Sequence, residues 1–331
     1  MAALLCMSGA AGCASSDAGP SGPPSYERLS QTGLYADLAA RGVSNGVVAF
    51  TPTFALWSDG AEKARWVSVP SGASIDTSDM DHWVFPIGTR VWKEFSLGGI
   101  ALETRLIERY GPEPEDYWMG AFVWEADGSD AVLTEEGLND VLGTGHDVPA
   151  QERCPACHNG ELGRVLGISA LQLAASTGKP DEHLTLNALA SDQRLSAPPL
   201  AGDAYVPPGD AVASEALGYL HANCGHCHNP RGTAWPDTQM LLRLGLEESL
   251  PGLAAEDSEL FQSVVGQRLQ YFRDQGQQIT ERVVAGRPEE SGLVARMAVR
   301  GPMEQMPPLA TEQVDPSGVD VVRAWIESLP E

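Results

Sequence analysis

The sequence Cys224-Gly225-His226-Cys227-His228 reads CGHCH, and the earlier stretch Cys154-Pro155-Ala156-Cys157-His158 reads CPACH. Cys-x-x-Cys-His is the attachment signature of c-type haem. Each cysteine sulfur adds to one vinyl group of a porphyrin, and the adjacent histidine binds the iron through a ring nitrogen. We therefore expect two covalently bound haems, attached by Cys154, Cys157, Cys224 and Cys227, with His158 and His228 as iron ligands.

A zinc site built from two Cys-x-x-Cys pairs is the alternative use of these cysteines. Cys154 and Cys224 are 70 positions apart, whereas the paired knuckles of zinc ribbons are about 15–20 residues apart. A four-cysteine zinc site also leaves the histidine after each motif without a role. The spacing therefore favours haem over zinc.

The chain is strongly acidic. Its 331 residues contain 45 Asp and Glu against 21 Lys and Arg, which gives a formal net charge of −24. Such a surface repels phosphate backbones and argues against nucleic-acid binding. It also attracts basic proteins, so a basic redox partner is one candidate, although the charge serves solubility as well.

The first 25 residues have the composition of a leader and a tether. Residues 1–12 are small and apolar, as at the end of a signal peptide. The stretch that ends at Cys13 resembles a bacterial lipobox and predicts a lipid anchor there. Residues 14–25 are rich in Ser, Gly and Pro and predict a flexible tether. No apolar run reaches the roughly 18 residues of a membrane-spanning helix, so we expect no transmembrane span.

Residues 26–150 are expected to form a β-rich domain. Short runs rich in β-branched and aromatic residues alternate with Gly, Pro, Asp and Ser, which is the pattern of strands joined by turns. The runs are residues 47–50, 64–69, 82–85, 90–95, 102–107 and 119–124. A β-sandwich or a small barrel would use their aromatic residues as its core.

Two mainly helical haem-binding units are expected after this domain. Residues 151–210 would form a first haem-binding segment, and residues 211–331 a second unit. A helix is predicted over residues 212–223, because Ala216, Leu220 and Cys224 recur at four-residue spacing and share one face.

A final helix is predicted to begin at Ser317, with Asp320 three residues later as the second half of a capping box. Its apolar stripe comprises Val322, Trp325, Ile326 and Leu329. The small Ala216 and the larger Leu220 would meet this stripe where the two helices cross.

Taken as a whole, the chain resembles a family of bacterial diheme c-type cytochromes. The phrases that carry the resemblance are LSQTGLYADL, FALWSDGAEKARWVSVP, WVFPIGTRVWKEF, LETRLIER, CPACHNG, ANCGHCHNPRG, VVAGRPEESGLVARM and MPPL, within residues 29–327. The resemblance implies a class I cytochrome c-like domain over residues 211–331. It also implies export to the periplasm or cell envelope, where covalent haem attachment takes place.

The resemblance also suggests the sixth iron ligands. A methionine followed by proline in a loop before the last helix is the usual distal ligand, which favours Met306, with Met303 as the second choice. The first haem has no evident partner: Met80, His82, Met119, His146 and His183 are candidates. If none of them binds, that iron would be five-coordinate and open to a small ligand.

The sequence therefore predicts an exported electron carrier rather than a catalyst, and it indicates no catalytic residues. Two alternatives remain. One is a diheme peroxidase-like enzyme with an open coordination site at the first haem. The other is a redox subunit in which the β-rich domain docks a periplasmic dehydrogenase.

Overall fold

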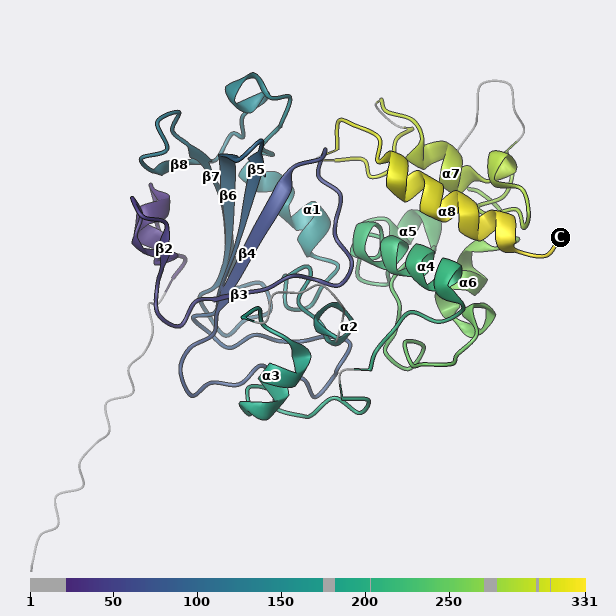
Figure 1. The fold of residues 1–331 in the computed structure, drawn as a ribbon, viewed down its shortest axis with the longest axis horizontal. Coiled ribbons are helices and arrows are strands. Elements are labelled where there is room, and N and C mark those ends of the chain that lie inside the picture. Colours follow the sequence, from purple (N-terminus) through teal and green to yellow (C-terminus); the bar gives the residue numbers. More distant parts are fainter. Residues whose placement is uncertain (1–21, 175–181, 203, 271–278, 302–303, 310) are drawn as a thin grey trace, which may run out of the picture.

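A computed structural model describes residues 22–174, 182–202, 204–270, 279–301, 304–309 and 311–331 (Figure 1). The leader, Cys13 with its predicted lipid anchor, and Met303 lie outside the described residues. Within the described part of the chain, no helix is long and apolar enough to cross a membrane.

A six-stranded antiparallel sheet forms the first half of the fold, with its strands in sequence order. The strands are β3 (Val48–Ala49), β4 (Glu62–Ser68), β5 (Arg90–Leu97), β6 (Ile100–Arg109), β7 (Tyr117–Trp124) and β8 (Ala131–Thr134). A separate two-stranded sheet pairs β1 (Tyr35–Asp37) with β2 (Gly42–Val43). Five of the six predicted β runs thus contain a strand of the large sheet, and residues 82–85 contribute only an isolated bridge at Val84.

The two faces of the sheet have different chemistry because successive side chains point to opposite sides. One face carries Trp92, Leu106 and Phe122, which pack on Leu29 and Leu34. Leu29 begins a 3₁₀ helix, η1 (Leu29–Thr32), that lies over this face. The short 3₁₀ helix and Tyr35 of the two-stranded β1–β2 sheet therefore cover this face, where a β-sandwich would place a full second sheet.

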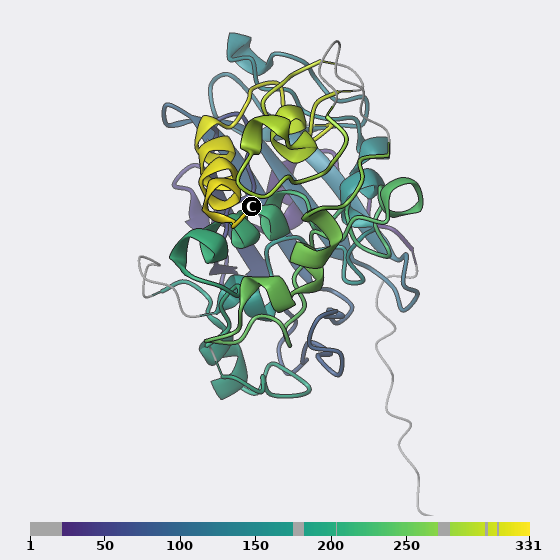
Figure 2. The same cartoon turned by 90° about the vertical axis from the view of Figure 1, so that its right-hand side faces the viewer.

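Helices are short and fill the remainder of the chain. The α helices are α1 (Cys154–His158), α2 (Ala170–Leu173), α3 (Leu186–Ser191), α4 (Ala211–Asn223), α5 (Trp235–Thr238), α6 (Glu259–Val264), α7 (Gly292–Met297) and α8 (Pro316–Ser328). Further 3₁₀ turns are η2 (Val141–Gly143), η3 (Gln151–Arg153), η4 (Ala255–Asp257) and η5 (Pro288–Glu290). In the view turned by 90°, the C-terminal helices lie in front of the strands (Figure 2).

The predicted fold class is wrong on two counts. The β-rich part is a single open meander rather than a sandwich or barrel. The part after residue 150 is not a pair of mainly helical cytochrome c-like haem domains: within the described residues only α4 and α8 reach 13 residues, and the other α helices have four to six. Proline and glycine, at 24 and 35 copies, favour turns and end helices early.

The two long helices pack against each other and largely confirm their predictions. Helix α4 covers the predicted segment, and Asp210 caps it by accepting a hydrogen bond from the Ala213 N–H. Helix α8 begins one residue before Ser317, because Asp315 accepts from the Gly318 N–H and Pro316 takes the first position. The prediction that Ser317 caps this helix is therefore wrong. The apolar stripe is confirmed, since its four residues are buried with Ala216 and Leu220.

Candidate functional site

A cavity of about 420 Å³ lies where the sheet meets the helical part of the chain. This volume is typical of a site for a small molecule or cofactor. Its walls include all seven residues predicted to hold haem: Cys154, Cys157, His158, Cys224, Cys227, His228 and Met306. The four cysteines carry free thiols. Folding thus brings together two motifs that are 70 residues apart in the sequence.

The two motifs enter the cavity on different local structures. CPACH is helix α1, with Pro155 in its first turn, where a missing N–H costs nothing. CGHCH follows directly on helix α4, and Cys224 is its C-cap. A β-carbon at Gly225 would lie 2.6 Å from the carbonyl oxygen of His221 and 2.9 Å from that of Leu242, so only glycine fits that spacer position.

The motifs also touch each other through Gly160, which follows CPACH. A β-carbon on Gly160 would overlap the carbonyl oxygen of His226 and lie 2.9 Å from Nδ2 of Asn229. The Asn229 amide in turn donates to the carbonyl oxygens of Gly225 and His226. The backbones of the two motifs are therefore in direct contact, and a glycine makes that contact possible.

Both motif histidines are neutral and held by one ring nitrogen. Nδ1 of His158 donates to the carbonyl oxygen of Arg164 at 2.6 Å, and Nδ1 of His228 lies 3.4 Å from the hydroxyl of Thr238. Burial lowers the pKa of each imidazole to about 4. Ring nitrogens fixed through Nδ1 in this way leave Nε2 as the atom for a metal ion, which is the usual arrangement for a ligating histidine.

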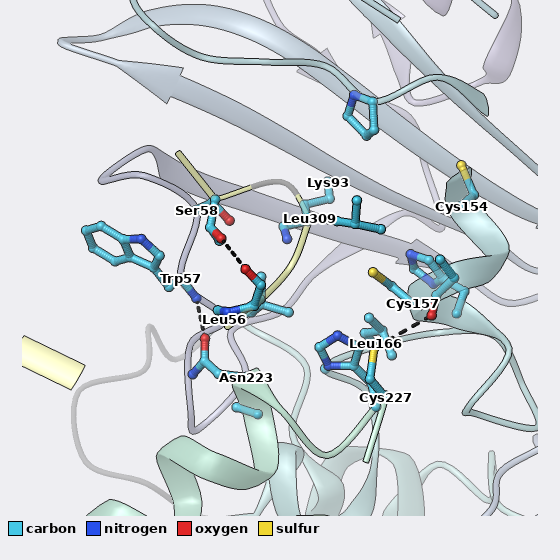
Figure 3. A pocket seen from close by; sticks show the side chains of 18 of the residues that line it. Leu56, Trp57, Ser58, Lys93, Cys154, Cys157, Leu166, Asn223, Cys227 and Leu309 are labelled. Carbon is cyan, nitrogen blue, oxygen red and sulfur yellow. Dashed lines mark hydrogen bonds between the residues drawn. The ribbon is translucent and has the colours of Figure 1, made fainter. Parts of the chain in front are cut away.

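Cys157, His226 and Cys227 form a close cluster. One ligand atom from each lies within 4.8 Å of the others. Figure 3 shows the sulfurs of Cys157 and Cys227 near each other, with Cys154 farther along α1. The pKa of the Cys157 thiol is lowered because the Cys227 thiol and His226 hydrogen-bond to it, and the pKa of Cys227 is raised by the same bond. The sequence motif gave His226 no role, since it occupies a spacer position.

The proposed ligands of the first haem separate into two groups. Met119 and His146 line the cavity, whereas Met80, His82 and His183 are not among its lining residues. His183 is bonded to Thr51 at 2.8 Å. His146 is also engaged, because Nε2 lies 2.8 Å from the carboxylate of Glu103.

Two methionines that line the cavity were not predicted as iron ligands from the sequence. Met240 and Met297 line the same cavity as Met306. Neither is followed by proline, which was the local signal for a ligand loop. Their positions become apparent only once the chain has folded around the cavity.

An ionic network forms part of the cavity wall on the sheet side. Arg105 donates to both carboxylate oxygens of Glu103, at 2.8 and 2.6 Å, and His146 meets the same carboxylate. The pKa of Glu103 is lowered by these partners in spite of its complete burial. Glu103 is therefore ionised and offsets the charge of Arg105.

His221 in helix α4 provides a pH-dependent element next to the cavity. Its Nδ1 accepts the backbone N–H of Leu244 at 3.1 Å, and burial lowers its pKa to about 3. Between pH 6.5 and 3 the unfolded chain binds a proton that the folded chain does not, so acidification through this window lowers the free energy of unfolding. We expect wild-type protein to lose on the order of 2 kcal/mol more than His221→Asn between pH 6.5 and 4.5 in urea titrations. Equal losses would show that His221 is protonated in the folded state.

No family model matches the chain, and no match was found among curated proteins or solved structures.

Proposed function

We propose that the protein is an exported diheme c-type cytochrome that transfers electrons. Cys154 and Cys157 would attach one haem and Cys224 and Cys227 the other, with His158 and His228 as proximal ligands and Met306 as a distal ligand. Each bound haem would supply a one-electron Fe(III)/Fe(II) couple, whose potential a methionine ligand raises.

The convergence of both Cys-x-x-Cys-His motifs on one cavity is the observation that carries this proposal. A motif that arose by chance has no reason to place its cysteines and its histidine in the same cavity wall as a second copy. Here the histidines are neutral and fixed through Nδ1, as an iron ligand requires.

The walls of the cavity also have the apolar character that a porphyrin would need. Apart from the motif residues they are mainly apolar, with Leu242, Leu293, Met297, Val165 and Leu309 among them. Apolar walls exclude water from an iron centre and favour the state with the lower charge, which raises the reduction potential. These walls suit a redox cofactor that stays bound.

The acidic surface suggests the kind of redox partner. With a net charge of −24, the protein would be steered toward basic electron donors and acceptors. A periplasmic or cell-envelope location, with a lipid on Cys13, is part of the same proposal and rests on the leader sequence. The same negative charge would also suit docking to a periplasmic dehydrogenase. Co-purification of that enzyme would distinguish this role from electron transfer between free redox proteins.

Optical and EPR spectra of the holoprotein, made in a host that attaches haem, test the proposal. We expect two covalently bound haems and at least one low-spin histidine–methionine centre. A colourless protein that contains zinc would instead assign Cys157, His226 and Cys227 to a metal-ion site.

Met306→Leu should abolish the near-infrared absorption that reports iron–sulfur ligation and lower the midpoint potential of one haem by at least about 59 mV, a tenfold change in its reduction equilibrium. Leucine keeps the volume and removes the sulfur. Met240→Leu and Met297→Leu are matched controls, because both side chains line the same cavity. Survival of the absorption in Met306→Leu and its loss in either control would move the ligand to that methionine.

A diheme peroxidase-like enzyme is the second candidate. The buried network of Arg105, Glu103 and His146 favours it, because it places a histidine and an arginine in the cavity wall. Proton transfer by a positioned histidine is a common catalytic device. A high-spin EPR signal that changes on addition of peroxide or cyanide would support this candidate over simple electron transfer.

A further inference from the structure

Three cations stand side by side on the cavity face of the sheet. The strand register places Arg65 of β4 opposite Lys93 of β5, and Lys93 opposite Arg105 of β6. All three line the cavity. Like charges directly opposite one another on neighbouring strands destabilise a sheet unless something offsets them.

The protein supplies an anion for only one of the three. Glu103 is bonded through both oxygens to Arg105. Within the described residues, the side chains of Arg65 and Lys93 have no hydrogen-bond acceptor and no ion-pair partner. The ammonium nitrogen of Lys93 lies over the Phe95 ring, 4.5 Å from its centroid. Lys63, the next cation on this face, differs because it donates to the carbonyl oxygen of Leu56 at 2.9 Å.

Other carboxylates of the cavity wall are already engaged. Asp59 accepts the backbone N–H groups of Glu312 and Gln313, both at 2.9 Å. Asp147 accepts the N–H of Asp140 at 2.8 Å. Within the described residues neither carboxylate forms an ion pair with Arg65 or Lys93, so these two cations have no paired anion.

Burial makes this imbalance costly. It lowers the pKa of Arg65 to about 10, and burial together with its cationic neighbours lowers the pKa of Lys93 well below the ordinary value. A buried cation is tolerated when it is paired and hydrogen-bonded. An anion in the cavity would supply both the opposite charge and the hydrogen-bond acceptors. A planar carboxylate matches the geometry of an arginine, which can donate two parallel hydrogen bonds.

We propose that Arg65 and Lys93 form a carboxylate-binding site in the cavity wall, and that its occupants are the two propionate groups of the haem attached at Cys154 and Cys157. This assignment rests on the proposed function. Arg65 and Lys93 offer one cation to each of the two propionates of a haem, and both line the same cavity as Cys154 and Cys157. A free carboxylate from solution is the other source of the same chemistry.

Lysine-selective NMR on the reduced holoprotein tests the proposal directly, because the chain has only three lysines, Lys63, Lys93 and Lys179. We expect Lys93 to titrate near the ordinary lysine value of about 10.4, since a bound carboxylate stabilises its charge. In the Cys154→Ala/Cys157→Ala protein, Lys93 should titrate at lower pH. A Lys93 that titrates at low pH in the holoprotein would overturn the proposal.

Sodium acetate distinguishes the two sources of carboxylate. If the site accepts any carboxylate, acetate should raise the Lys93 pKa of the haem-free protein, and this arm also tests the site should the chain carry no haem at all. No response to acetate, combined with a high pKa in the holoprotein, assigns the site to propionates alone. No response and no haem would overturn the proposal.

Two variants give an independent measurement. Arg65→Gln and Lys93→Met each remove one positive charge beside the first haem, which should shift its reduction equilibrium about tenfold toward the oxidised form, or about 59 mV. Lys63→Met is the matched control, because Lys63 lies on the same face but already has a backbone acceptor. Equal shifts in all three variants would show a general charge effect and no specific site.

Discussion

Replacing Cys224 and Cys227 together with alanine is expected to halve the covalently bound haem, leaving one haem per chain. The thioether bonds of the second motif would be lost, and those of Cys154 and Cys157 would remain, because under the proposed function each motif attaches its own haem. Haem staining after denaturing electrophoresis and the mass of the intact protein measure the result. The Cys154→Ala/Cys157→Ala protein should likewise keep one haem, attached at the other motif.

His226→Asn is the control that separates haem attachment from metal-ion binding. His226 belongs to the close cluster with Cys157 and Cys227 but is only a spacer in the CGHCH motif. Attachment of haem should therefore be unchanged, with two haems per chain. A metal-ion site would lose one of its three ligands and with it most of its affinity.

For the two double-alanine proteins, loss of both haems from either one would contradict independent attachment at the two motifs.

Gly160→Ala is expected to destabilise the protein by about 1–3 kcal/mol, because a β-carbon there overlaps the backbone of the second motif. The obstacle is the carbonyl oxygen of His226, a backbone atom, so no side-chain rotation can relieve it. Urea unfolding, with the midpoint and slope compared with those of wild type, measures the effect. If the chain carries the two proposed haems, their reduction potentials should shift in the same variant, since the motifs must move apart.

Gly245→Ala provides the matched control. A β-carbon at Gly245 would meet only the flexible carboxylate of Glu248 at 3.8 Å, and this glycine does not have a left-handed backbone. Its unfolding midpoint should stay close to that of wild type. If Gly160→Ala were equally mild, the contact between the two motifs would not contribute to stability.

Local sequence patterns predicted individual elements well. Helix α4 and the apolar stripe of α8 follow from four-residue spacing, and most strands of the sheet follow from β-branched and aromatic runs. Periodicity is a property of neighbouring residues, so it survives without knowledge of the fold. The predicted cap of α8 was wrong by two residues because Asp315 and Ser317 are both good caps, and only the folded chain shows which one accepts the hydrogen bond.

Long-range features could not be predicted in the same way. The number of layers around the sheet depends on what packs against each face, and the sandwich and the cytochrome-like helical domains were both wrong. Arg65, Lys93 and Arg105 lie in three separate β runs of the sequence. Their alignment on the cavity face depends on strand register, which the sequence alone does not give. The motifs predicted the site residues from their chemistry, and only folding places these residues in one cavity.

The contact between Gly160 and the backbone of His226 bears on how the protein would be made. Once the two motifs have closed on each other, the four cysteines are partly buried in the wall of a cavity that the sheet also lines. Enzymes that join haem to cysteine would need access to an open chain. Maturation would therefore proceed by haem ligation first and folding second, and the attached cofactors would act as the template around which the two halves of the chain assemble.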